Sequence, residues 1–165
     1  MTLEYTETQD DVEQDGGEEN HVTDPKAVIP FEDLGVSDAV LASIREMGFE
    51  MPTDVQAEAI PHALAGHDLL VQSRTGSGKT AAFAIPAASK LIDLSKNETQ
   101  ALVLAPTREL AMQVEKEVAR IGARSDLTTV AVYGGAAMGP QVDALDRGVH
   151  FVAATPGRLL DHIRR

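Results

Sequence analysis

Apolar residues in the last hundred positions gather in short runs, and segments with helical periodicity separate these runs. The runs predict strands at residues 68–72, 101–105, 128–133 and 150–154. The segments between them predict helices over 79–94 and 107–121, a short helix near 140–145, and a last helix opening after Pro156. Strands that are apolar throughout and alternate with helices are typical of a parallel sheet covered on both faces. The sequence therefore predicts an α/β fold with a doubly wound parallel sheet.

Two further helices are expected upstream of the first strand, within residues 28–66. Ser37 is a candidate N-cap for the first, whose apolar positions recur at helical spacing up to Gly48. Thr53 is a candidate N-cap for the second, in which Pro61 predicts a break or kink. The first strand and everything after it, residues 67–165, is assigned to the α/β domain itself.

Residues 1–27 differ from the rest in composition. They hold nine of the 26 acidic residues and one of the 14 basic ones, so much of the net charge of −12 lies in this tail. With few apolar residues and no period, the tail is predicted to be disordered. It serves either as a contact for protein partners or as a solubilising extension. The remaining body is mildly acidic, which neither supports nor excludes a nucleic-acid surface.

The composition of the 165 residues sets further limits. The chain is 43% hydrophobic but only 4% aromatic, which predicts a core that is mainly aliphatic. It has no cysteine, so disulfides and thiolate metal sites are excluded. No apolar run approaches the roughly 18–20 residues that span a bilayer, and no basic-then-apolar leader is present. A cytoplasmic monomer without a membrane partner is expected.

The turn after the first strand carries the clearest chemistry. An apolar strand leads into residues 73–80, Ser-Arg-Thr-Gly-Ser-Gly-Lys-Thr, and a helix follows. In such a turn, backbone N–H groups and the helix N-terminus surround phosphate oxygens. Lys79 would contact the β- and γ-phosphates, and the Thr80 hydroxyl would hold Mg²⁺. Ser73 stands where the strict P-loop pattern has glycine, and the bland alternative is an ordinary turn between strand and helix.

The later strands end in unusual turns as well. Pro106-Thr107-Arg108-Glu109 and Thr155-Pro156-Gly157-Arg158 each place a hydroxyl and an arginine at a helix start, and Gly134-Gly135 follows the third strand. Such groups bind phosphate oxygens, and several of them along one sheet edge favour an extended polyanion, a nucleic acid. Taken singly, each turn has a plain interpretation: Thr107 and Thr155 as N-caps, Arg108 as part of a solvated face, and the glycine pair as a simple turn.

Together these segments resemble the DEAD-box RNA helicases over about residues 31–165. Phe31 matches an isolated upstream aromatic of that family. Residues 48–56 are similar to its Q motif, although Asp54 stands where the family usually has proline. The phosphate-binding turn resembles motif I, in which serine is normal at the first position. The three later turns resemble motif Ia, the GG element and motif Ib.

The resemblance implies a RecA-like P-loop NTPase domain that uses ATP and Mg²⁺. Gln56 would read the adenine edge, Phe49 would stack on its ring, and Thr53 would help to position the P-loop. The implied cofactor-binding residues are Phe49, Thr53, Gln56, Ser73, Arg74, Thr75, Gly76, Ser77, Gly78, Lys79 and Thr80, of which Lys79 and Thr80 are the catalytic candidates. RNA would be bound through its sugar-phosphate backbone, with little sequence preference, by Pro106, Thr107, Arg108, Gly134, Gly135, Thr155, Pro156, Gly157 and Arg158.

The family's Asp-Glu-Ala-Asp motif does not occur in this sequence. The chain is therefore expected to be an incomplete first helicase domain, able to bind ATP but not to turn it over alone. The expected activity of the parent protein is RNA-stimulated ATP hydrolysis coupled to local duplex unwinding. Two alternatives stay open: another P-loop helicase or translocase that acts on DNA, and a non-catalytic module that binds nucleotide or RNA.

Overall fold

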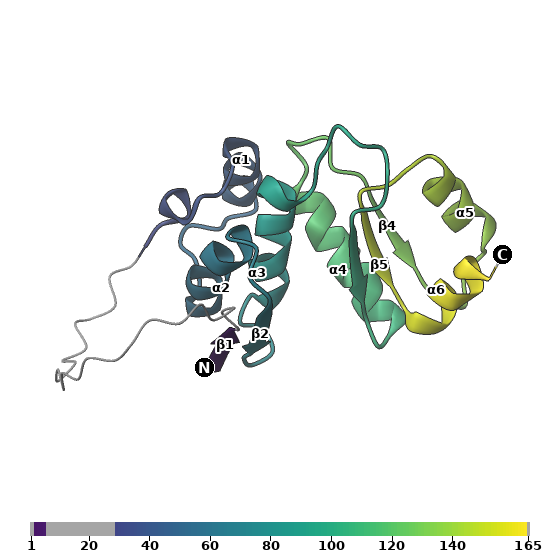
Figure 1. The fold of residues 1–165 in the computed structure, drawn as a ribbon, viewed down its shortest axis with the longest axis horizontal. Coiled ribbons are helices and arrows are strands. Elements are labelled where there is room, and N and C mark those ends of the chain that lie inside the picture. The colour runs from purple at the N-terminus through teal and green to yellow at the C-terminus, as the bar shows by residue number, and fades with distance from the viewer. Residues whose placement is uncertain (1, 6–28, 165) are drawn as a thin grey trace, which may run out of the picture.

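The computed structural model describes residues 2–5 and 29–164 (Figure 1). Its strands are β1 (Thr2–Tyr5), β2 (Leu69–Gln72), β3 (Ala101–Leu104), β4 (Thr129–Val132) and β5 (Phe151–Ala154). Its helices are η1 (Phe31–Leu34), α1 (Asp38–Glu46), α2 (Asp54–Leu64), α3 (Lys79–Pro86), η2 (Ala87–Leu91), α4 (Arg108–Ile121), α5 (Gly139–Asp146) and α6 (Pro156–Ile163). The order of strands and helices agrees with the sequence prediction from Asp38 onward.

Three strands form a parallel sheet in the order β3-β5-β4. Its strands are short and apolar, and β5 is buried along its whole length. Helix α4 packs on one face, while α5 and α6 bring Leu145 and Leu159 to a small cluster on the other (Figure 1). The doubly wound α/β prediction is confirmed for this sheet. Because its strands are parallel, the turns after β3, β4 and β5 all lie at one edge.

Strand β2 differs from the prediction of one continuous parallel sheet. It is not hydrogen-bonded to the β3-β5-β4 sheet and pairs instead with β1, antiparallel, with Thr2 opposite Gln72 and Tyr5 opposite Leu69. The prediction of disorder is therefore wrong for residues 2–5, whose Thr-Leu-Glu-Tyr sequence has strand propensity and meets an edge with unpaired backbone groups. The rest of the predicted acidic tail lies outside the described residues.

A cavity of about 460 Å³ separates β2 from β3. Leu69 and Val71 of β2 line it from one side, and Val103 and Leu104 of β3 line it from the other. Lys79 and Thr80 at the start of α3 also reach this cavity, together with Leu110 and Val114 of α4. The turn after β2 is thus close to the turn after β3, although the two strands share no hydrogen bonds.

The main core lies where α1, α3 and α4 meet the sheet, and it is aliphatic apart from Phe31 and Phe151. The predicted helix over 79–94 is modified at Pro86, which has no N–H to donate: α3 ends there and a π-helical turn continues to Leu91. Helix α2 runs through Pro61, so of the break or kink expected there the break is absent, and the kink stays a prediction. None of the helices in the described ranges has the length and apolarity of a membrane span.

Candidate functional site

The turn between β2 and α3, residues 73–80, forms a glycine loop that we call the phosphate loop. Gly76 and Gly78 have φ angles of +78° and +89°, a region that residues with a Cβ rarely adopt. Gly78 is also the N-cap of α3. The first N–H groups of α3 have no acceptor within the helix and carry its partial positive charge. The backbone therefore presents donors at the end of β2, as the sequence predicts for a phosphate site.

Lys79 turns its side chain back over this loop. Its Nζ donates to the carbonyl oxygens of Ser73 at 2.5 Å and Arg74 at 2.7 Å. The ammonium therefore lies inside the curve of the loop, where the phosphates of a nucleotide would need a positive charge. Ser77 also faces inward: its hydroxyl is buried and makes no hydrogen bond within the part of the chain that the structure describes.

The N-terminus of α2 is tied directly to the phosphate loop. The Thr53 hydroxyl donates to the Ser77 carbonyl at 2.9 Å, and the Gln56 amide donates to the Gly78 carbonyl at 3.2 Å. Gln56 Oε1 accepts in turn from the Thr53 backbone N–H at 2.9 Å. A Cβ on Gly78 would lie 2.3 Å from Gln56 Nε2, so a larger residue at this position would displace the amide. The Thr53 hydroxyl thus contacts the loop, while its predicted role in positioning the loop stays a prediction.

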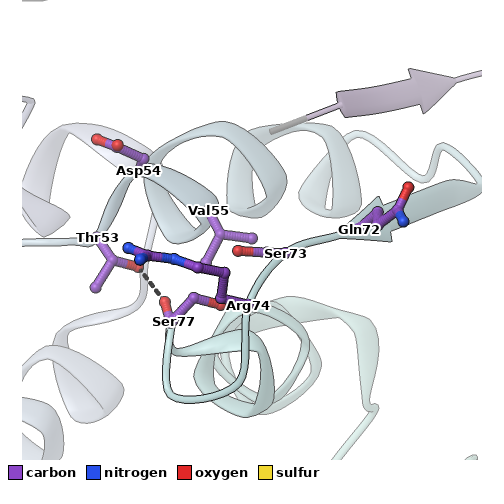
Figure 2. Close-up of a pocket in the computed structure, with 7 residues that line it drawn as sticks. All are labelled: Thr53, Asp54, Val55, Gln72, Ser73, Arg74 and Ser77. Atoms are coloured by element: carbon purple, nitrogen blue, oxygen red, sulfur yellow. Dashed lines mark hydrogen bonds between the residues drawn. The ribbon is translucent and has the colours of Figure 1, made fainter.

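A cavity of about 790 Å³ opens between the α2 N-terminus and the phosphate loop, and we call it the loop cavity. It is lined by Thr53, Asp54, Val55, Gln72, Ser73, Arg74 and Ser77. Figure 2 shows the Arg74 side chain extending from the loop toward the start of α2, while the Asp54 carboxylate points away from the loop. The volume of the loop cavity lies within the range of small-molecule sites, and the lining of the cavity is partly polar.

Two predicted adenine contacts lie outside the lining of the loop cavity. Phe49 is half-buried and stacks on Phe31, with ring centroids 6.3 Å apart. Gln56 is only 3% exposed; its amide nitrogen donates to the Gly78 carbonyl, and its amide oxygen accepts from the Thr53 N–H. The amide group keeps one further N–H and one further acceptor position. Adenine recognition by these two residues therefore stays a prediction.

Glu117 on α4 lies beside the predicted Mg²⁺ ligand, and sequence reasoning did not identify it. Burial raises the pKa of its carboxyl above the ordinary value, while Arg120 and a hydrogen bond with the Thr80 hydroxyl oppose the shift. No group of three His, Asp or Glu side chains that could hold a metal by itself is found in residues 2–5 and 29–164. Thr80 is thus suited to add one oxygen to an ion that nucleotide phosphates and water also bind.

The turn after β3 holds the motif Ia residues at the start of α4. Thr107 caps the helix by accepting from the Leu110 N–H at 3.2 Å, so its plain interpretation as an N-cap is correct, and its hydroxyl proton is still available to a ligand. Arg108 is exposed and pairs with Glu109, at 2.5 Å between Nε and Oε1. This hydrogen bond holds the pKa of the Glu109 carboxyl below its usual range.

The glycine pair and motif Ib lie beside that turn. Gly135 has a φ of +82°, and a Cβ there would be 3.5 Å from Nη1 of Arg108, so the turns after β3 and β4 are neighbours. Thr155 caps α6 without a side-chain hydrogen bond. Arg158 is different: its side chain is 12% exposed and donates to Gln141 and to the Ala136 carbonyl. Gln141, a buried residue of α5, carried no signal in the sequence.

A glycine loop followed by lysine and threonine at a helix start, beside a parallel α/β sheet, defines a P-loop nucleotide-binding domain. The model of the DEAD/DEAH box helicase family matches residues 53–165, which is most of the chain. The chain therefore belongs to the DEAD/DEAH box helicase family.

Similar proteins agree with this assignment. The DEAD-box ATP-dependent RNA helicase CshA of Bacillus cereus is 48% identical over 82% of this chain, and that match spans 26% of the relative. CshA of Geobacillus kaustophilus is 45% identical, covering 82% of this chain and 29% of the relative. The crystal structure of a DEAD box protein from Methanococcus jannaschii superimposes with a TM-score of 0.75 and 44% identity, over 82% of this chain and 37% of that one. The chain thus spans between 26% and 37% of the length of these proteins.

Proposed function

We propose that this chain provides the ATP-binding site and part of the RNA-binding surface of an ATP-dependent RNA helicase. One observation carries the nucleotide half of the proposal: the Lys79 ammonium lies inside the phosphate loop, on the carbonyls of Ser73 and Arg74. A lysine so placed meets phosphate oxygens when its bonds to these two carbonyls are exchanged for bonds to the ligand. The names of the similar proteins, ATP-dependent RNA helicases, support ATP and RNA as the ligands.

Each residue of the loop has a distinct part in binding ATP with Mg²⁺. Loop N–H groups and the start of α3 would hold the phosphate oxygens, and Lys79 would neutralise their charge. The Thr80 hydroxyl would hold the ion, which when bound withdraws charge from the β- and γ-phosphates. Thr53 and Gln56 keep the loop in register with α2 through its Ser77 and Gly78 carbonyls. A change in the loop on nucleotide binding would therefore alter its contacts with the α2 N-terminus.

RNA would bind along the edge at which β3, β4 and β5 end. The exposed Arg108 guanidinium, the Thr107 and Thr155 hydroxyls and the Gly134-Gly135 turn lie there, with Pro106, Pro156 and Gly157 in the same exposed turns. These groups suit phosphate and sugar oxygens and do not discriminate between bases. Lys79, Thr80 and the end of β3 line one cavity, so nucleotide and RNA would bind on adjacent turns.

We further propose that this chain binds ATP without hydrolysing it at a measurable rate. Among the described residues that line the loop cavity, Asp54 is the one acid, and its carboxylate points away from the loop (Figure 2). The Glu117 carboxyl lies outside that lining and is hydrogen-bonded to the Thr80 hydroxyl. Hydrolysis needs a group that orients the attacking water. Turnover and duplex unwinding are proposed for the longer protein, as the greater length of the similar proteins suggests.

Calorimetric titration of the 165-residue chain with ATP and Mg²⁺ tests the nucleotide site. Lys79→Ala should weaken binding about ten- to a hundredfold, because a charge-assisted contact is lost. Lys90→Ala is the matched control, since Lys90 is exposed on η2, away from the loop. Equal affinity for Lys79→Ala and the unaltered chain would refute the nucleotide proposal. Competition between RNA and DNA of one sequence would distinguish an RNA surface from the DNA alternative.

A further inference from the structure

Gln141 is a buried polar residue that connects two of the turns at the proposed RNA surface. It lies on α5, and only 6% of it is exposed. Its Nε2 donates to the Tyr133 carbonyl at 3.1 Å, immediately before the Gly134-Gly135 turn. A buried amide is stable only when its polar atoms are bonded, so this contact fixes the backbone at the end of β4.

The oxygen of the same amide reaches α6. Gln141 Oε1 accepts from Arg158 Nη1 at 3.2 Å and from His162 Nε2 at 3.1 Å. Arg158 Nη2 then donates to the Ala136 carbonyl at 3.1 Å, on the far side of the glycine pair. The glycine turn is thus held at both ends, at Tyr133 by Gln141 and at Ala136 by Arg158. We call Gln141, Arg158 and these two carbonyls the Gln141 bridge.

Arg158 and Arg108 have opposite environments. The Arg108 side chain is 60% exposed, and among the described residues it pairs with the exposed Glu109 carboxylate. The Arg158 side chain is 12% exposed, and its Nε is buried without a hydrogen bond to any described residue, 3.9 Å from the Asp161 carboxylate. Two guanidinium nitrogens of Arg158 donate inward and the third is covered. A phosphate could therefore reach the Arg108 guanidinium directly, whereas the Arg158 guanidinium is mostly covered and already donates to Gln141 and Ala136.

We propose that Gln141 is a positioning residue of the RNA surface and that Arg158 acts with it to set the spacing of two turns, without contacting phosphate. This inference rests on the proposed RNA binding of the previous subsection. The bridge joins the Gly134-Gly135 turn to the start of α6, so the two turns meet successive parts of an RNA backbone in a fixed relation. Such preorganisation lowers the entropy lost on binding. Motif Ib then contacts RNA through the Thr155 hydroxyl and its backbone.

The salt dependence of RNA binding separates a phosphate contact from a positioning role. Each contact with a single strand contributes about −0.7 to the slope of log K against log salt. Binding of a fluorescent ten-nucleotide uridine RNA to the 165-residue chain would be followed by anisotropy at several KCl concentrations. Arg108→Met should weaken binding and make the slope shallower by about 0.7. Arg147→Met, which removes an exposed arginine outside these turns, controls for the loss of net charge.

Arg158→Met and Gln141→Met should each weaken RNA binding by about tenfold while leaving the slope as in the unaltered chain. Arg158→Lys should not rescue the affinity, because an ammonium group cannot reach both the Gln141 oxygen and the Ala136 carbonyl as a guanidinium does. A shallower slope for Arg158→Met, with affinity restored by Arg158→Lys, would make Arg158 a phosphate contact and overturn the inference. So would full affinity in Gln141→Met.

A measurement on the unaltered chain avoids variants that fail to fold. In nitrogen-15 NMR spectra, the Arg108 side-chain signal should shift when RNA is added, while the Arg158 Nε signal should exchange slowly and stay in place. A large RNA-dependent shift of the Arg158 signal would contradict the bridge. If the unaltered chain binds no RNA at all, the proposed function itself fails, whereas binding with an altered slope in Arg158→Met refutes the bridge alone.

Discussion

Two buried glutamines hold the two candidate surfaces, and their partners differ. Gln56 is 3% exposed, and its hydrogen bonds within residues 2–5 and 29–164 are to backbone groups, the Thr53 N–H and the Gly78 carbonyl. Gln141 is 6% exposed and bonds to one backbone carbonyl and to two side chains, Arg158 and His162. In both, the amide nitrogen donates to a carbonyl within or next to a glycine turn. Each glutamine thus fixes the backbone of a turn whose glycines are conformationally free.

The difference lies in what can change each arrangement. The Gln56 contacts can be broken only by moving the phosphate loop or the start of α2, so this arrangement responds to whatever the loop binds. The Gln141 contacts depend on a guanidinium and an imidazole, whose geometry responds to substitution on α6. Among the described residues, the Gln56 amide is therefore held by backbone groups, whereas the Gln141 amide is held partly by two side chains of α6.

The largest expected effect is that of Gly78→Ala, compared with Gly76→Ala. Both glycines have positive φ, so each alanine costs about 1–2 kcal/mol of backbone strain. Only at Gly78 would the new Cβ also meet Gln56, at 2.3 Å, whereas nothing lies within 4 Å of a Cβ at Gly76. Gly78→Ala should therefore lose a further 1–3 kcal/mol or so of unfolding free energy, from overpacking, together with nucleotide affinity.

Urea unfolding of the two variants, followed by circular dichroism, provides the comparison. Equal destabilisation at both positions would show that the Gln56 amide moves aside without cost. The contact between α2 and the phosphate loop would then be incidental, and the similarity between the two glutamines would no longer hold.

A crossed experiment on Gln56→Met and Gln141→Met is expected to have the next largest effect. Each substitution keeps the side-chain length but removes at least two hydrogen bonds of a buried amide, at about 0.5–1.5 kcal/mol each. Gln56→Met should lower the affinity for ATP and leave RNA binding nearly unchanged, while Gln141→Met should do the reverse. Titrations of both ligands against both variants measure this directly. If each variant lowered both affinities alike, the two glutamines would share one function and the comparison above would be wrong.

The sequence predicts Gln56 only through its place in a segment that resembles the DEAD-box Q motif. It predicts the phosphate loop from a local signal, because a Gly-Lys-Thr turn between strand and helix has a distinctive order of residues. Gln141 has no such signal. Its partners Tyr133, Arg158 and His162 are eight, 17 and 21 positions away, and only the packing of α5 against α6 and the end of β4 brings them together.

The pairing of strand β2 could not be predicted from local sequence, for a similar reason. Apolar runs identify β2 and β3 as strands, but nothing in either run states which strand pairs with which. Pairing of β2 with residues 2–5 is a contact between segments more than sixty positions apart, and part of an acidic stretch supplies the partner strand. The average composition of residues 1–27 is acidic and polar, so it gives no sign that residues 2–5 form a strand that pairs with β2.

The smallest effect is expected from His162→Ala. Gln141 Oε1 accepts from both Arg158 and His162, and this variant distinguishes the contribution of His162 from that of Arg158. Since a carbonyl oxygen only accepts, His162 must donate through Nε2, at 3.1 Å. His162 is half-exposed, so water can replace it at Gln141, and the loss should be about 0.5–1 kcal/mol of unfolding free energy, with RNA affinity almost unchanged. Thermal unfolding beside Arg158→Met tests the order of the two effects. If His162→Ala cost as much as Arg158→Met, the imidazole and not the guanidinium would be the main partner of Gln141, and the nucleic-acid side would be held through the end of α6 instead of its start.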